Sequence, residues 1–120
     1  MKEVKVYKEY FDSGELMEEI YHIDDFMHDN WHRTDGPAYT EYNIKGKTMY
    51  KSYWVNNKRH RVDGPAVINY YKKDGQIDGQ IACEEYYLND YWCTKEEFLA
   101  SKEHQNYLAD KAIDKMLKGE

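Results

Sequence analysis

The side chains with the clearest potential for chemistry belong to a motif that occurs twice. Residues 31–38, Trp-His-Arg-Thr-Asp-Gly-Pro-Ala, recur 28 residues later as residues 59–66, Arg-His-Arg-Val-Asp-Gly-Pro-Ala, with six of the eight positions identical. Histidine beside aspartate can act as an acid–base pair in a hydrolase. His32 with Asp35, and His60 with Asp63, are therefore candidates for catalysis. However, a catalytic site rarely needs two tandem copies, so the recurrence favours a structural use.

The structural interpretation starts from the turn residues inside the motif. Glycine can adopt positive φ without a Cβ clash, and proline fixes φ and lacks a backbone donor. The aspartate can accept hydrogen bonds from the turn or from the arginine two positions earlier, which would fix the bend. The residues given this structural role are Arg33, Asp35, Gly36, Pro37, Arg61, Asp63, Gly64 and Pro65.

Other chemistry finds little support in the sequence. The histidines and aspartates between residues 22 and 32 match no tetrahedral zinc spacing. Adjacent carboxylates such as Glu18 and Glu19 point to opposite faces of a strand, so they cannot share a proton. There is no glycine-rich phosphate loop and no nucleophile motif. We therefore expect no metal, no cofactor and no enzymatic activity.

The elements that position the motifs are expected to be short strands. Aromatic and β-branched residues flank each motif between glycine, asparagine and aspartate positions, which is typical of strand, turn, strand. Residues 4–11 and 16–23 predict the first two strands. Asn56-Asn57 and Asn89-Asp90 suit tight hairpin turns. The 120 residues fit one domain, predicted to be mainly β: an antiparallel meander of three hairpin-like repeats over residues 1–93.

The end of the chain is expected to form a helical cap over residues 94–118. Thr94 and Glu97 have the spacing of a capping box, and apolar residues then recur at helical spacing. This segment is one long helix or two helices broken near residue 104. We expect its apolar side to pack on the last strands or on a second copy of the chain, through Phe98, Leu99, Leu108, Ala112 and Met116.

The repeat pattern resembles the MORN-like variant repeats. The resemblance rests on the His-Arg-x-Asp-Gly-Pro-Ala motif between strands, with repeats of about 28–33 residues over roughly residues 10–92. Such repeats occur in proteins of bacteriophages and giant viruses and in bacterial antitoxin or immunity-type proteins. The resemblance implies a non-enzymatic β-meander that presents a surface to a partner.

Charge is unevenly distributed along the chain, which bears on partners. Residues 1–30 carry a net charge of −6, residues 31–75 carry +5 and residues 76–120 carry −5. An acidic surface could attract a basic host or cognate protein, such as a nucleic-acid-binding enzyme, and occlude its groove. The first functional hypothesis is thus a protein-binding module, in one version a phage-type inhibitor of a host defence nuclease or toxin. Its expected contact residues are Glu15, Glu18, Glu19, Asp24, Asp25 and Asp29.

The alternative hypothesis is nucleic-acid binding through residues 45–73. Basic and aromatic side chains interleave there, as they do on single-strand-binding surfaces. The residues expected to take part are Lys45, Lys47, Lys51, Trp54, Lys58, Arg59 and Arg61.

The sequence also bears on the compartment of the protein and on the state of its two cysteines. The N-terminus has no apolar signal region and no segment is long enough to span a membrane, so we expect a cytoplasmic protein, in the host cytoplasm if it is viral. Cys83 and Cys93 are then expected to be reduced and partly buried, with a disulfide between them as the alternative.

Overall fold

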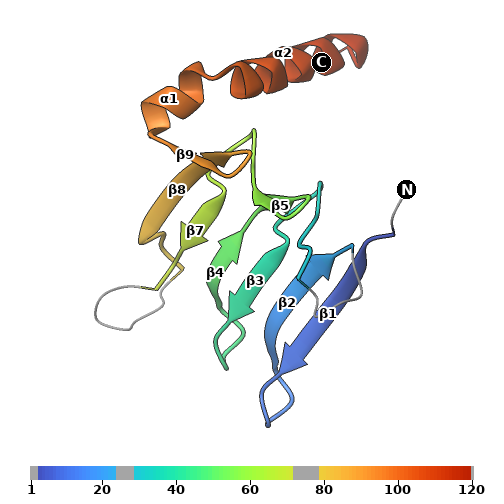
Figure 1. Ribbon diagram of the computed structural model, residues 1–120, viewed down its shortest axis with the longest axis vertical. Helices are drawn as coiled ribbons and strands as arrows, with labels where there is room; N and C mark the ends of the chain where they lie inside the picture. The colour runs from blue at the N-terminus through green and yellow to red at the C-terminus, as the bar shows by residue number, and fades with distance from the viewer. Residues whose placement is uncertain (1–2, 24–28, 72–78, 120) are drawn as a thin grey trace.

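The computed structural model describes residues 3–23, 29–71 and 79–119, and its main element is an antiparallel sheet (Figure 1). The predicted mainly β meander with a C-terminal helical end is confirmed. The seven strands lie in the order β1-β2-β3-β4-β7-β8-β9, so that each strand pairs with its neighbour in the chain except where the small β5–β6 hairpin intervenes. Their bounds are β1 Lys5–Tyr10, β2 Leu16–His22, β3 Tyr39–Tyr42, β4 Thr48–Ser52, β5 Trp54–Val55, β6 Lys58–Arg59, β7 Val67–Asn69, β8 Cys83–Leu88 and β9 Tyr91–Cys93.

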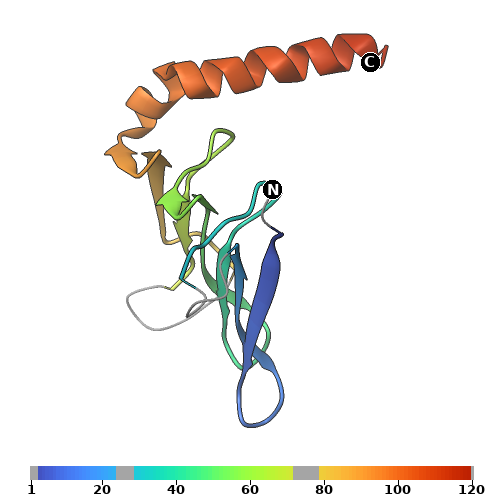
Figure 2. The same cartoon turned by 45° about the vertical axis from the view of Figure 1, so that its right-hand side comes forward.

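The sheet is a single layer. Both helices lie beyond one end of the strands rather than over a face of the sheet (Figures 1 and 2). Few side chains can then be fully buried; Ala38 and Ala66, the last residues of the two motifs, are 0% exposed, and Ile20, Val67 and Ile68 are also buried. Tyrosine suits this architecture because its ring covers a thin sheet while its hydroxyl stays near water.

Two tight turns form as the sequence predicts. Asn56 and Asn57, between β5 and β6, have φ of 49° and 64°, and Asn89 and Asp90, between β8 and β9, have φ of 49° and 72°. Positive φ at both central residues is the hairpin geometry that Asn and Asp tolerate best among residues with a side chain.

The helical end begins where the sequence predicts, but it is broken at Ser101, before the predicted break near residue 104. The predicted capping box is confirmed: Thr94 Oγ1 accepts from the Glu97 N–H at 3.1 Å, and the Glu97 carboxylate accepts from the Thr94 N–H at 2.8 Å. Helix α1 (Lys95–Ala100) ends at Ser101, and α2 (Lys102–Leu117) begins there. The predicted break near residue 104 is therefore misplaced, because the Ser101 hydroxyl caps α2 by accepting from the His104 N–H at 3.1 Å.

Only the first part of the helical end packs on the sheet. Phe98 is 2% exposed and its ring lies 4.8 Å from that of Tyr86 in β8. His104 is also buried, and its Nδ1 lies 2.8 Å from the Val62 carbonyl oxygen in the second motif. By contrast, Leu108 and Met116 in α2 are 45% and 78% exposed. The expected packing of these two side chains on the last strands is therefore wrong. Figure 2 shows α2 extending away beyond the end of the strands. Leu99 and Ala112 are exposed as well.

The two cysteines are free thiols in the structure. Cys83 is exposed rather than partly buried, and Cys93 is half-buried, with its sulfur 3.7 Å from the Tyr86 carbonyl oxygen. Burial raises the pKa of the Cys93 thiol, with Glu97 and Glu103 adding to the effect. A raised pKa leaves less of the Cys93 thiol as thiolate, which is its reactive form.

Candidate functional site

In the first motif the arginine acts as a clamp across the turn. The Arg33 Nε donates to the Asp35 carboxylate at 2.8 Å, and its Nη1 donates to the Pro37 carbonyl at 3.2 Å. The guanidinium also lies over the ring of Tyr21 in β2, 3.9 Å from the ring centroid. The arginine holds the pKa of Asp35 below its usual value. One side chain thus ties the turn to the strand before it.

The second motif repeats the same contacts. Arg61 Nε donates to Asp63 at 2.9 Å, Nη1 donates to the Pro65 carbonyl at 3.0 Å, and the guanidinium lies 4.0 Å from the ring centroid of Tyr53. The Arg61 side chain is only 21% exposed. All contacts of this arginine are internal, which leaves its polar atoms little freedom to meet a substrate.

The glycines of the motifs have a different role from the one expected. Neither Gly36 nor Gly64 has positive φ. Instead, a Cβ at Gly36 would lie 2.8 Å from the Arg33 Cζ, and one at Gly64 would lie 3.0 Å from the Arg61 Cζ. The conformational explanation is therefore wrong: what glycine provides here is room for the guanidinium to pack against the backbone, and a larger residue would make the arginine side chain shift.

The histidines join consecutive repeats. His32 Nδ1 accepts from the Asn56 N–H at 2.9 Å, and His60 Nδ1 accepts from the Asn89 N–H at 2.9 Å. Each ring therefore holds the tight hairpin of the following repeat. The two histidines lie one repeat apart and bond to different hairpins. Their Nδ1 atoms are engaged as acceptors, and the acid–base pairs considered from the sequence do not form a shared site.

This arrangement predicts a pH dependence of stability. Burial lowers the pKa of His60 from its ordinary 6.5, and Glu103 opposes this in part. Because the unfolded chain binds the proton more readily, the contribution of His60 is complete above pH 6.5 and is lost as the pH falls through the lowered folded-state pKa. Urea unfolding between about pH 7.5 and pH 5.5 should show this loss, and His60→Asn should reduce its slope. An unchanged slope would contradict the role of the ring as an acceptor.

One face of the sheet carries three carboxylates directly opposite one another. The register pairs Glu9 with Glu18 and Glu18 with Glu41, and we call these three residues the acidic row. Paired residues on antiparallel strands share a face, with Cβ atoms about 4.5–5.5 Å apart, and like charges there destabilise the sheet. All three are half-buried. Within residues 3–23, 29–71 and 79–119, no lysine or arginine forms an ion pair with them.

Tyrosines partly satisfy the acidic row. Tyr7 donates to Glu9, and the Tyr39 hydroxyl lies 2.6 Å from a Glu41 oxygen and 3.1 Å from a Glu18 oxygen. Burial, followed by the hydrogen bond to Glu41, holds the pKa of Tyr39 well above its ordinary value of 10. The hydroxyl is therefore protonated, but it has one proton and can donate to only one carboxylate at a time.

Aromatic rings continue this face beside the acidic row. Trp31 stacks on Tyr39 with ring centroids 4.9 Å apart, and Trp54 meets Trp31 edge-on at 5.0 Å. Tyr50 contacts Tyr39 edge-on at 5.9 Å. The face therefore combines half-buried carboxylates with flat, rigid rings, the features of a recognition surface for cationic side chains.

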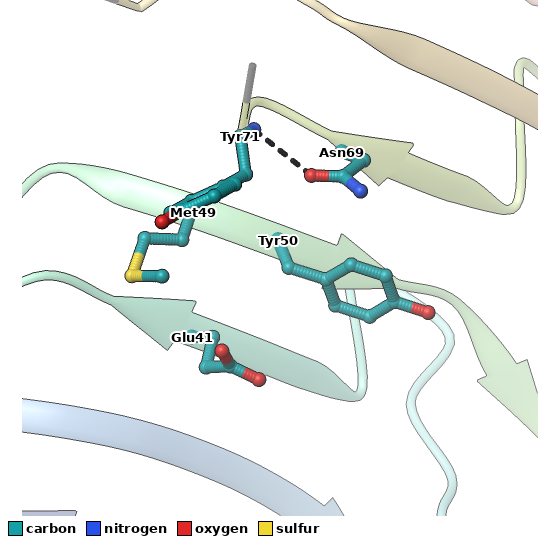
Figure 3. A pocket seen from close by; sticks show the side chains of 5 residues that line it. All are labelled: Glu41, Met49, Tyr50, Asn69 and Tyr71. Carbon is teal, nitrogen blue, oxygen red and sulfur yellow. Dashed lines mark hydrogen bonds between the residues drawn. The ribbon is translucent and has the colours of Figure 1, made fainter. Parts of the chain in front are cut away.

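A hollow opens at the end of the acidic row (Figure 3). It has a volume of about 370 Å³ and we call it the Glu41 pocket; its lining residues are Glu41, Met49, Tyr50, Asn69 and Tyr71. The register pairs Glu41 with Tyr50 and Tyr50 with Asn69, so these three side chains share one face. The Asn69 side-chain oxygen accepts from the Tyr71 N–H at 2.9 Å and fixes the chain where β7 ends.

The structure separates the acidic residues proposed from the sequence. Glu18 belongs to the acidic row, whereas Glu19 lies on the other face, 3.9 Å from the Lys8 ammonium. Glu15 lies beside the β1–β2 turn, where it accepts from the Ser13 hydroxyl. Asp29 is exposed before Trp31. Asp24 and Asp25 lie outside the described residues. Glu9 and Glu41 become partners of Glu18 only through the strand register, which the sequence alone does not show.

The basic residues of the alternative hypothesis do not gather on one face. Lys45 and Lys47 lie in the β3–β4 turn, where their backbone N–H groups donate to Asn43. Lys58 lies in the β5–β6 hairpin, at the opposite end of the strands (Figure 1). Lys51 pairs with Ile68 on the face away from Tyr50.

The two arginines of this set are already engaged. Arg59 is ion-paired with Asp90 at 3.1 Å and lies over the rings of Tyr87 and Trp54. Arg61 is the clamp of the second motif. Trp54 uses its indole N–H to donate to the Ser52 hydroxyl at 2.7 Å. These residues therefore do not form a common surface that could bind phosphates.

These features define a single-layer repeat β-sheet whose motifs hold the turns and whose one face carries the acidic row and the Glu41 pocket. Searches of protein-family models, of curated proteins and of solved structures each return no match for the chain. Within the described ranges, no group of three or more histidine, cysteine or acidic side chains has the geometry of a metal site. Likewise, no helix in that part of the chain has the length and apolar character needed to cross a bilayer.

Proposed function

We propose that the protein is a non-enzymatic binding module of the MORN-like repeat kind, and that it captures a basic partner protein on the face bearing the acidic row. The observation that carries this proposal is the cross-strand set of Glu9, Glu18 and Glu41 without a basic counterpart among the described residues. The row costs the sheet stability, and a cationic partner would remove that cost on binding.

The rest of the structure supports a surface rather than a catalytic pocket. The His-Arg-x-Asp residues are engaged in holding turns and joining repeats. The face of the sheet is not covered by the helices, which lie beyond the ends of the strands (Figure 2). A rigid β scaffold with charged and aromatic side chains suits protein recognition, since little side-chain entropy is lost on binding. Inhibition of a nucleic-acid-binding enzyme or toxin is the version of this function that the charge favours.

Glu18 and Glu19 provide a matched test because they are neighbours with the same chemistry on opposite faces. The probe is a lysine-rich peptide, and binding is measured by calorimetry at low and moderate salt. Glu18→Gln should weaken binding about threefold to tenfold, whereas Glu19→Gln should change it by less than about twofold. Glu18→Gln should also raise the free energy of unfolding by about 0.2–1 kcal/mol, because a like-charge contact is removed.

Equal weakening by the two variants would mean that only net charge attracts the peptide, and the proposal would fail. The nucleic-acid alternative is addressed by a mobility-shift assay at low salt with single- and double-stranded oligonucleotides. A shift that disappears on Lys51→Gln and Lys58→Gln, but not on Glu18→Gln, would favour that alternative instead. Self-association through the exposed side of α2 stays a prediction.

A further inference from the structure

All three arginines of the chain make the same pair of contacts: the guanidinium lies over a tyrosine ring and donates to an aspartate. Arg33 lies 3.9 Å from the Tyr21 ring centroid and donates to Asp35; Arg61 lies 4.0 Å from that of Tyr53 and donates to Asp63. Arg59 lies 4.1 Å from the Tyr87 ring centroid and donates to Asp90 at 3.1 Å. A tyrosine face with a carboxylate beside it is thus the arrangement with which this protein holds a guanidinium.

The Glu41 pocket offers the same two groups without an arginine. Tyr50 and Tyr71 supply rings, and Glu41 supplies the carboxylate (Figure 3). Tyr71 is 49% exposed, so its ring is open to an incoming group. The Met49 thioether adds a polarizable wall. None of the arginines or lysines in the described part of the chain lines this pocket.

We propose that the Glu41 pocket is the anchor site for an arginine side chain of the partner protein. The guanidinium lies against the Tyr71 or Tyr50 ring and donates to the Glu41 carboxylate, while neighbouring basic residues of the partner lie along Glu18 and Glu9. This proposal rests on the proposed function, because it specifies which partner residue the acidic face selects. Arginine is favoured over lysine because its planar fork can stack on a ring and bind a carboxylate at once.

The volume is compatible with this occupant. About 370 Å³ is enough for one long side chain and is small for a folded element. The pocket adjoins the acidic row through the direct Glu18–Glu41 pairing. An extended basic segment could therefore place one arginine in the pocket and its flanking charges on the row.

The test compares two synthetic peptides that differ only in the side chain of their central residue. Both carry lysines around a central residue, which is arginine in one and citrulline, its neutral analogue, in the other. Amide chemical shifts of the isotopically labelled protein are followed during titration. The arginine peptide should bind about tenfold more tightly than the citrulline peptide and should shift the amides of Glu41, Tyr50 and Tyr71.

Pocket variants complete the test. Tyr71→Ala and Glu41→Gln should each remove most of the preference for arginine, whereas Glu9→Gln should weaken both peptides to the same extent. Equal binding of the two peptides on the acidic row would overturn the arginine anchor and leave the proposed function standing. Absence of binding at the row by either peptide would overturn both. A third peptide carries lysine at the central position. If it binds as tightly as the arginine peptide, the arginine anchor is also overturned, because the pocket would then select for positive charge alone.

Discussion

Phe98→Ala should lower the free energy of unfolding by about 3–5 kcal/mol, the cost of removing a large buried aromatic side chain. Phe98 is 2% exposed and lies between Tyr86 of β8 and His104 of α2, with ring centroids 4.8 Å and 4.7 Å away. It is the main apolar contact between the helical end and the sheet. Chemical denaturation followed by circular dichroism measures the effect.

The same variant should separate the helical end from the repeats. Amide hydrogen exchange along α2 should become faster, because a helix of 16 residues is marginal in water without tertiary contacts. Leu99→Ala is a suitable control, since Leu99 lies in the same helix but is 45% exposed. Its effect should stay within about 0.5–1 kcal/mol. If Leu99→Ala proves as costly as Phe98→Ala, the docking of α1 described above is wrong.

Arg61→Ala should lower the free energy of unfolding by about 2.5–3 kcal/mol. The variant removes a charged hydrogen bond to the Pro65 carbonyl, an ion pair with Asp63 and the contact with the Tyr53 ring. These contribute about 1.5, 0.5 and 0.5–1 kcal/mol respectively. Arg61→Lys should recover less than half of the loss, because an ammonium lacks the planar fork. Urea unfolding of the three proteins measures the difference.

The contact of Arg61 with Gly64 gives an independent check by a double-mutant cycle. Gly64→Ala should displace the guanidinium, because the added Cβ lies 3.0 Å from Cζ. Gly64→Ala should therefore cost much less in the Arg61→Ala background than in the wild type. Additive effects would show that the glycine has some other role.

The sequence was informative wherever a local pattern determines structure. Asn56-Asn57 and Asn89-Asp90 predicted the hairpin turns, and Thr94 with Glu97 predicted the start of α1, since each depends on a few neighbouring residues. The sequence predicts the helix break too late, because Ser101 acts as the N-cap of α2 without an acidic residue three positions on. Ser101 followed by Lys102-Glu103-His104 lacks the full capping-box signal.

Contacts between distant residues were beyond sequence reasoning. The repeated histidines were visible, but their bonds to Asn56 and Asn89 span 24 and 29 residues and require the stacking of repeats. The role of Gly64 depends on where the Arg61 guanidinium packs. Likewise, Glu18 and Glu41 meet only through the β2–β3 register. The sequence therefore shows the acidic segment as a charge pattern, whereas the face that concentrates the charge depends on the strand register.

The duplicated motifs build the scaffold, and we propose that the acidic row binds the partner. The most direct test of this division measures stability and binding of the lysine-rich peptide side by side for Arg61→Ala and Glu18→Gln, at a temperature where both variants are folded. We predict that Arg61→Ala loses stability and keeps the wild-type affinity, whereas Glu18→Gln keeps or gains stability and loses affinity. The opposite pattern, with binding lost at Arg61 and unchanged at Glu18, would contradict it.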